Sequence, residues 1–541
     1  MPLIISSDKT QLTNFRDKMA YPIYLTIGNI PKDIRQKPSC LAQVLIGYIP
    51  TTKFAAITSV ATRRRALANL FHMCMQMVLG PIALYGETGI PMMSGDGIWR
   101  RCHPIFAVFV RDYPEQALVT CTYYGQCPKC EVPPGQLGEY QSFPSRVQSL
   151  VIDTYLSADA DMHAFYSACR EAGMKPVHHP FWEYFPLVDI FLSITPDILH
   201  QMLQGMVKHL IGWLVSIFGP AAIDARCRAI PPNHKTTLFI KGIANHSRIS
   251  GQEHKRICCI LFGLVLDLPV PDRWDPSRIT RAVHALTDFL FISQYQCQTS
   301  NTLQRLENCL AVFHDNKDVF VDLGVREHFN FPKLHSLSHY VSSIRLFGTT
   351  DNYNTEQSER LHIDFTKDAY RASNKKDEYF QMTKWLERRE KVQLRTALID
   401  WRKQEDLQRS TSRNLIGPPH ASTLTTIIAQ RHTRRVSFDD LAMDYGAVQF
   451  QDALGDYIAK VNNPGAAASV IRDRSRNTLI PFSHVPVFHH FKFVERGNSQ
   501  TVDAVEARPE QRDSHGWIIP PRFDTVVVQS SGPKGTVIQT H

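Results

Sequence analysis

Short apolar runs that end on polar residues dominate the first part of the chain. Residues 3–5 and 21–29 form two such runs around the polar turn 6–10, which predicts two strands. Residues 104–110 form a third, strongly apolar run that ends on Arg111-Asp112, and we also expect a strand at 117–122. Between them, apolar residues spaced by three and four predict an amphipathic helix over 62–79.

The middle of the chain has a helical pattern, and strands return at its end. From about 150 to 345 the pattern is mainly helical, with expected helices at 197–213, 278–295 and 302–313. Two further helices are expected at 355–372 and 377–398. Residues 402–422 turn polar and predict a linker, and short strands are expected at 485–488, 517–519 and 523–528.

This order of elements predicts an α/β fold. We expect a ribonuclease-H-like catalytic core interrupted by a large, mainly α-helical insertion, with a small β-rich C-terminal region. The expected parts are the first part of the core (1–124), a zinc loop with the helical insertion (125–345), an acidic helix that completes the core (346–401), a linker with a helical segment (402–475) and the β-rich region (476–541).

Composition narrows the classes of function only slightly. The 541 residues include 60 Lys and Arg against 51 Asp and Glu, and this net charge of +9 permits a nucleic-acid partner without requiring one.

Charged residues within 1–20 exclude a secretory signal, and the longest apolar stretch, 210–223, is shorter than a bilayer span of about 20 residues. We therefore expect an intracellular, reducing compartment and no membrane segment. Phosphate loops (GxxxxGK[ST]), HExxH and GxSxG are missing, which weighs against an ATPase, a zincin and a serine hydrolase.

Four acidic residues are candidates for a two-metal site. Asp8 and Asp112 each follow an apolar run, so both can project from one edge of a sheet. Glu356 and Glu359 are three apart and share a helix face. Phosphoryl transfer with two metal ions about 4 Å apart needs such carboxylates. The alternative is that all four are ordinary surface acids.

Cys127 and Cys130 have the spacing of half a zinc site, because two thiolates two residues apart fit adjacent tetrahedral vertices. Candidates for the other two ligands are Cys121, His178, His179, His200 and His209. The alternatives are a pair of unligated loop cysteines and, for His200, a hydrogen-bonded core histidine.

Three basic groups could contact phosphates. They are Arg63-Arg64-Arg65, Arg100-Arg101 beside Trp99, and Arg388-Arg389 with Lys391. Solvated helix faces explain such clusters equally well.

Long strings of the sequence resemble the fungal Plavaka transposases, relatives of the CACTA cut-and-paste DNA transposases. They include SSDKTQLT, YPIYLTIGNIPKDIRQKPS, RRRALANLFHMCM, SGDGIWRRCHPIFAVFVRDYPEQALVT, CPKC, SITPDILHQMLQGMVKHL, VDLGVREHFNFPKLHSLSHY, FGTTDNYNTEQSERLHIDFTKDAYRASN and PPRFDTVVV.

The resemblance implies an Asp-Asp-Glu site that uses Mg²⁺ or Mn²⁺ to cut and join DNA. Its acids fall on Asp8, Asp112 and either Glu359 or Glu356, with a preference for Glu359. Its Cys-x-x-Cys and helical histidine fall on Cys127, Cys130 and His200 and imply structural Zn²⁺. It further implies DNA (transposon ends and target) as partner, no membrane, a homo-oligomer and a nuclear location.

The chain also departs from that family. Met1 lies seven residues before Asp8 and the C-terminus stops at His541, so we expect a copy truncated at both ends. One alternative is therefore a catalytically inactive relic that acts as a DNA- or protein-binding module. Another is a helical scaffold with a purely structural zinc pair.

Overall fold

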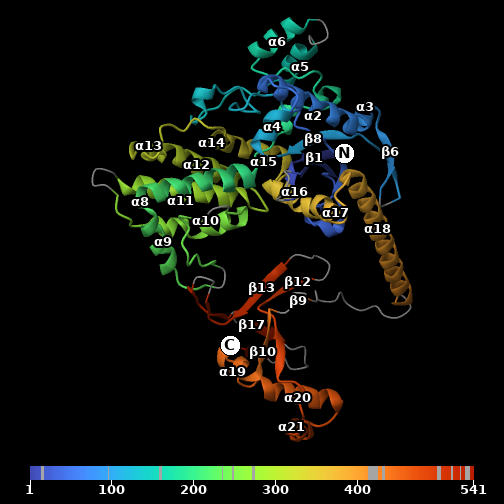
Figure 1. The fold of residues 1–541 in the computed structure, drawn as a ribbon, viewed down its shortest axis with the longest axis vertical. Coiled ribbons are helices and arrows are strands. Elements are labelled where there is room, and N and C mark those ends of the chain that lie inside the picture. Colours follow the sequence, from blue (N-terminus) through green and yellow to red (C-terminus); the bar gives the residue numbers. More distant parts are fainter. Residues whose placement is uncertain are drawn as a thin grey trace. The chain divides into compact units, whose positions relative to one another are not determined.

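The computed structural model divides the chain into two compact units (Figure 1). One unit comprises 1–225 and 242–413, and the other comprises 226–241 and 414–541. The structure describes residues 1–13, 18–94, 97–156, 161–233, 236–245, 249–270, 275–411, 424–428, 433–495, 501–512, 516–523, 526–529 and 537–540. The mixed α/β class expected from the sequence is confirmed.

A four-stranded sheet in the order β5-β4-β1-β8 organises the first unit. The central strand β1 (Pro2–Ser7) is antiparallel to β4 (Pro22–Ile27), which is antiparallel to β5 (Val44–Tyr48). On its other side β1 runs parallel to β8 (Ile105–Val110), with Ser6 beside Val110. The strands expected near the N-terminus and at 104–110 are confirmed, and parallel pairing makes the polar residues after β1 and β8 leave the sheet at one edge.

One face of this sheet is covered by α2 (Val60–Ala83), which confirms the helix expected at 62–79. The Ser59 side chain accepts the backbone N–H of Thr62 and begins the helix. Phe71, Met75 and Leu79 are buried in the core cluster that also contains the sheet. Burying a side chain of this size stabilises the fold by about 1.5–3 kcal/mol.

The same helical stretch meets a length and composition test for a membrane span. Val60–Thr88, which includes α3 (Tyr85–Thr88), has a mean hydropathy of 1.5 over its most apolar window, 33% of which is buried. Ile198–Phe218 together with Pro220–Ala229 passes as a bent pair. Buried core helices meet this test as well, and the expected absence of a membrane segment stays a prediction.

The strand expected at 117–122 is wrong, because the first half of this segment belongs to the helix α4 (Tyr113–Val119) and a turn follows it. Asp112 caps its N-terminus and Pro114 lies in its first turn, where the missing N–H of proline costs nothing. A short apolar run has no decisive periodicity, so the capping residues before it carried the better signal.

The helical middle of the chain is confirmed, with changes at the element boundaries. The helix expected at 197–213 is a π-helix, η5 (Ile198–Val207), continued by α8 (Lys208–Phe218). The one expected at 355–372 is three consecutive pieces, α16 (Thr355–His362), η8 (Ile363–Lys367) and α17 (Asp368–Arg371). The last long helix, α18 (Glu378–Thr411), continues into the predicted linker.

The helical block contains further helices. They are α5 (Gln148–Leu156), α6 (Met162–Glu171), α7 (Ile190–Ser193), α9 (Pro220–Ala229), α10 (Gly251–Val265), α11 (Pro276–Ser293), α12 (Ser300–Asn316), α13 (Val319–Asp322), α14 (Pro332–His335), η6 (Ser336–His339) and α15 (Tyr340–Phe347). Of these, α10, α11 and α12 lie side by side, and α5 and α6 lie above α2 (Figure 1). The expected helices at 278–295 and 302–313 correspond to α11 and α12.

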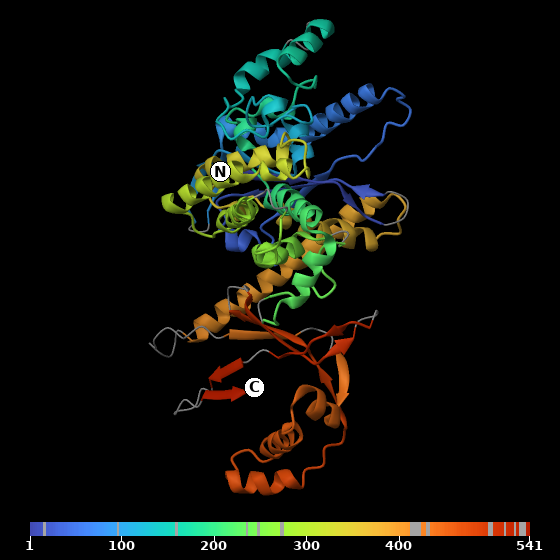
Figure 2. The same cartoon turned by 90° about the vertical axis from the view of Figure 1, so that its left-hand side faces the viewer.

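The second unit combines strands and helices (Figure 2). One sheet has the order β16-β13-β12-β9, formed by Arg522–Phe523, Thr501–Arg508, His490–Glu495 and Leu424–Ile428. The helices are α19 (Phe438–Tyr445), α20 (Phe450–Asn462) and α21 (Ala468–Arg476). The strands expected at 485–488 and 517–519 are β11 (His484–Val487) and β15 (Ile518–Ile519). The one expected at 523–528 divides between β16 and β17 (Val526–Gln529), and residues 524–525 lie outside the described residues.

Candidate functional site

The ends of β1 and β8 bring an acid, a cation and a second acid together. Register pairs Ser6 with Val110, so continuing both strands by two residues places Asp8 beside Asp112. An Asp8 Oδ1 lies 2.7 Å from Nη2 of Arg111, whose side chain is 1% exposed. Asp112 Oδ1 accepts the backbone N–H of Glu115 at 3.3 Å and so caps α4. Asp112 is thus fixed at the junction between the sheet edge and a helix.

Arg111 is the electrostatic centre of this region. Burial lowers its pKa, and surrounding carboxylates act against that shift because they favour the charged guanidinium. Those carboxylates belong to Glu115, Asp112, Asp197 and Glu359. The buried guanidinium of Arg111 therefore interacts electrostatically with acids from four parts of the chain, namely the end of β8, α4, the start of η5 and α16.

A carboxylate–histidine–carboxylate chain joins η5 to α16. His200 lies between Asp197, whose Oδ2 is 2.8 Å from Nδ1, and Glu359, whose Oε1 is 3.0 Å from Nε2. Burial alone would lower the pKa of His200, but the hydrogen bonds to both acids outweigh it and raise the pKa to about 10. The ring therefore carries a positive charge at neutral pH, and it fixes the Glu359 carboxylate.

Asp197 also ties the two helices together directly. Its Oδ1 accepts the hydroxyl of Thr355 at 2.7 Å and the backbone N–H of Thr355 at 3.2 Å. Burial would raise the pKa of Asp197, yet its hydrogen bonds with His200 and Thr355 lower it below the ordinary value. This buried, ionised acid positions both His200 and the start of α16.

The two candidate glutamates of α16 have different surroundings. One turn after Glu359, the ring of His362 places Nε2 3.7 Å from Oδ2 of Asp8. Glu356 instead accepts the side-chain amide of Asn354 at 3.1 Å, and burial raises its pKa. Contacts with His200 and the charge on Arg111 associate Glu359 with the strand-end acids, whereas the Glu356 carboxylate contacts Asn354, the residue that caps α16.

Glu115 is a further acid at this edge. Its carboxylate accepts hydrogen bonds from the hydroxyls of Tyr21 and of Ser7, the latter at 3.2 Å. Burial raises the pKa of Glu115, and the charge on Arg111 opposes that effect.

Sequence reasoning missed Arg111, Glu115, Asp197 and His362. Arginine is rarely fully buried, so adjacency to Asp112 did not suggest a role for Arg111. Asp197 was recognisable as the cap of a helix whose third residue is His200, since capping acids contact that turn. His362 follows Glu359 by three residues and shares its helix face.

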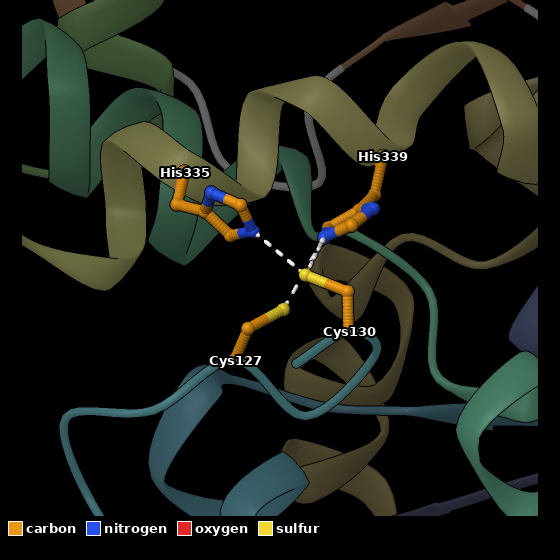
Figure 3. A group of neighbouring side chains, drawn as sticks. All are labelled: Cys127, Cys130, His335 and His339. Atoms are coloured by element: carbon orange, nitrogen blue, oxygen red, sulfur yellow. Dashed lines mark hydrogen bonds between the residues drawn. The ribbon is translucent and has the colours of Figure 1, made fainter. Parts of the chain in front are cut away.

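A second cluster collects Cys127, Cys130, His335 and His339 (Figure 3). The cysteines come from the loop after α4, and the histidines lie four residues apart along α14 and η6. All four ligand atoms lie within 4.8 Å of one another. Two thiolates and two imidazoles are a donor set of structural zinc sites.

The distances fit a tetrahedral ion. Cys127 Sγ lies 3.2 Å from Nε2 of His339, and Cys130 Sγ lies 3.1 Å from Nε2 of His335 and 3.8 Å from that of His339. Zn–S and Zn–N bonds of about 2.3 and 2.0 Å imply tetrahedron edges of roughly 3.5 Å. Zinc would therefore fit after shifts of a few tenths of an ångström.

One of the two thiols favours the thiolate form that a metal ion binds, whereas a hydrogen bond with Cys127 and burial raise the pKa of the other, Cys130. Burial opposes ionisation of Cys127, but contacts with Cys130, His335 and His339 hold its pKa well below the ordinary value. The backbone N–H of Lys129 donates to Cys127 Sγ at 3.3 Å, which further suits a thiolate. The spacing of His335 and His339, His-x-x-x-His, was a usable signal that sequence analysis overlooked.

The residues that were expected to complete the zinc site lie elsewhere. Cys121 Sγ contacts His72, and the backbone N–H of His178 donates to Asn69. His179 faces Glu183, His209 stacks on Trp213, and His200 belongs to the acidic region described above.

The basic groups differ in whether acidic residues of the chain already form ion pairs with them. Arg389 contacts Asp364, and Lys391 pairs with Glu387 within the same helix. Arg100 and Arg101 lie on β7 (Trp99–Cys102), which pairs with β6 (Ile90–Met93).

Among the described residues, the Cys₂His₂ cluster has its four ligand atoms close enough to hold a metal ion, and it lies in a unit of mixed α/β structure. Residues 1–214 match the family model described as Plavaka transposase. The matched range contains Asp8, Asp112, Cys127, Cys130 and His200, whereas α16 and the two zinc-type histidines lie beyond it. No curated protein matches the chain.

Proposed function

We propose that this chain is a transposon-derived DNA transposase that cleaves and joins DNA through Asp8, Asp112 and Glu359. The observation that carries the proposal is the parallel register of β1 and β8, which sets Asp8 beside Asp112. The link from Glu359 through His200 to Asp197 brings α16 to the same buried cation. A sheet of three antiparallel strands with a fourth parallel to the first also supports the proposed ribonuclease-H-like core.

Asp8, Asp112 and Glu359 would hold Mg²⁺ or Mn²⁺, because hard divalent ions prefer carboxylate oxygens. Bound there, the ions would supply an activated attacking oxygen and charge stabilisation for the leaving oxygen. The chain's own residues fix the carboxylates. Arg111 holds Asp8, the cap of α4 holds Asp112, and charged His200 holds Glu359.

Cys127, Cys130, His335 and His339 would hold structural zinc, consistent with a closed set of four protein ligands. That centre would fasten the loop after α4 to α14 and η6. It would thereby keep Asp112 in a fixed relation to the helical block. The chemistry proposed for the acids makes DNA the partner, and a homo-oligomer in the nucleus belongs to the same proposal.

The test is a nicking assay on supercoiled DNA with and without Mg²⁺. Asp112→Asn is the sharpest variant, because asparagine keeps the helix cap while removing the charge. We expect Mg²⁺-dependent nicking to fall by at least about 100-fold, a loss of roughly 3 kcal/mol of barrier stabilisation. Asp161→Asn, at the cap of α6, is the matched control and should retain wild-type nicking.

Two further variants identify the third acid. Glu359→Gln should abolish nicking, whereas Glu356→Gln should retain most of it. Nicking by Asp112→Asn at the wild-type rate, or wild-type protein that binds DNA and never cuts it, would refute the enzyme and support a binding relic.

A further inference from the structure

One cavity of the first unit is lined by neither the candidate acids nor the thiol cluster. It has a volume of about 980 Å³ and lies between α2, the end of α4 and α6. Figure 1 shows α5 and α6 above α4 and next to α2. Its lining includes four cationic side chains, Arg64, Arg65, Arg170 and Lys175. Among the residues that the structure describes, no acid lines it.

Much of this positive charge is not neutralised by the protein. Arg64 and Arg170 are exposed, and their guanidinium groups have no hydrogen-bond or ion-pair partner within the described ranges. Lys175 donates to the carbonyl of Ala117 at 3.1 Å, an uncharged acceptor. Such a concave cationic surface attracts phosphate groups.

Aromatic side chains line the same cavity. Tyr123 and Tyr124 are 39% and 74% exposed, and Tyr166 lies beneath Arg65, whose guanidinium carbon is 5.1 Å from the ring centroid. Exposed tyrosines next to arginines suit the faces of unpaired bases, since every base can stack on an aromatic ring. Duplex DNA would present only phosphates here, because its bases are already stacked.

One short helix connects this cavity to the acidic site. Asp112 caps the N-terminus of α4, and Leu118 near its other end lines the cavity. Seven residues at 1.5 Å each span about 10 Å, a distance that a few nucleotides of one strand can cover. Tyr113, the first residue of α4, also packs its ring 5.3 Å from that of Tyr124.

We propose that this cavity binds an unpaired nucleotide of the DNA strand, a few positions from the phosphate at Asp112. Arg64 and Arg170 contact its phosphates and Tyr124 contacts its base. The inference rests on the proposed function for its substrate, and it adds a site for a nucleotide outside the duplex. DNA with an unpaired end is therefore bound more tightly than blunt DNA.

The experiment measures binding of the full chain by fluorescence anisotropy, without Mg²⁺ and without chelator. The probes are a labelled blunt duplex and the same duplex with a short unpaired 3′ end. Wild type should bind the second about tenfold more tightly, as expected for one stacked base. Tyr124→Ala should remove this preference, and Tyr124→Phe, which keeps the ring, should retain it.

The arginines are tested through salt dependence. Arg64→Ala/Arg170→Ala should reduce the slope of log affinity against log salt by about 1.4 on the unpaired probe, from two lost phosphate contacts. Arg305→Ala/Arg345→Ala makes the same charge change on α12 and α15 and should leave the preference for the unpaired end intact.

Equal affinity of wild type for both probes would overturn the inference, and so would a preference that survives in Tyr124→Ala. Equal losses on both probes in the arginine variant would show duplex phosphate binding and would overturn it as well. Asp112→Asn should keep the preference, so a failed nicking assay and a failed nucleotide site remain distinguishable.

Discussion

Single buried polar residues set the electrostatics of the first unit. The side chain of Arg111 is 1% exposed and forms an ion pair with Asp8. Hydrogen bonds to Asp197 and Glu359 raise the pKa of His200 and so favour its charged form. Removing Asp8 would leave the buried charge of Arg111 without its ion-pair partner and would destabilise the protein. Function and stability are therefore coupled at these positions, and variants that keep shape while changing charge are the informative ones.

His72 provides a residue-scale prediction about pH. Its Nε2 lies 3.0 Å from the carbonyl of Leu118, and its Nδ1 accepts the backbone N–H of Phe181. Both ring nitrogens are satisfied by the neutral form, and burial lowers the pKa of His72 from 6.5 to about 4. Between pH 6.5 and about pH 4, His72 is protonated in the unfolded chain and neutral in the folded chain. The free energy of unfolding therefore falls by about 3 kcal/mol as pH drops from 6.5 to 4.

Thermal midpoints measured from pH 7 to pH 4 check this prediction. Wild type should lose more stability than His72→Asn, whose amide cannot titrate. Other histidines with lowered pKa values, His209, His314 and His362, act in both proteins, so the difference isolates His72. Parallel curves for the two proteins would contradict the prediction.

At the scale of elements, the π-helix η5 depends on a glycine. A Cβ on Gly205 would lie 2.8 Å from the carbonyl oxygen of His200 and 2.9 Å from Cδ of Lys333 on α14. The carbonyl belongs to the turn that carries the Asp197–His200 chain and cannot move independently. Gly205→Ala should therefore destabilise the protein by about 1–3 kcal/mol, as overpacking generally does.

Gly212 in α8 is the matched control, since nothing lies within 4 Å of its added Cβ. Gly212→Ala should be neutral or stabilising by up to about 1 kcal/mol, because alanine loses less backbone entropy in a helix. Chemical denaturation of the two variants beside wild type is the measurement. Equal stability of both variants would show that η5 can shift freely.

The sequence predicted elements well where periodicity and burial agree. The apolar runs before Asp8 and Asp112 predicted two strands, and both strands are present as β1 and β8. The segment 117–122 misled because Ala-Leu-Val suits a strand or a helix, and its capping acid was assigned a different role. The contact with His200 distinguishes Glu359 from Glu356. The sequence alone could not do so, because residues three apart share the same face of a helix.

At the scale of the whole chain, the metal-type cluster was only half predictable. Cys127 and Cys130 are adjacent enough to be recognised as a pair, but His335 and His339 lie about 200 positions later. Their identity follows from how the helical block returns to the loop after α4, which local patterns do not encode. The four-residue spacing of His335 and His339 is itself typical of metal ligands. Only the fold shows that these histidines and the two cysteines belong to one site.

Metal removal tests whether this junction holds the first unit together. Purified protein should contain about one zinc per chain, and a chelator should lower its thermal midpoint, because an ion bound to the folded form at 1,000 times its dissociation constant adds about 4 kcal/mol. Cys127→Ser should lack zinc, melt earlier and show no further response to chelator. Cys259→Ser, an exposed cysteine of α10, should behave as wild type. Full zinc content in Cys127→Ser would instead place the ion elsewhere, and the loop after α4 would need another anchor to hold Asp112 beside Asp8.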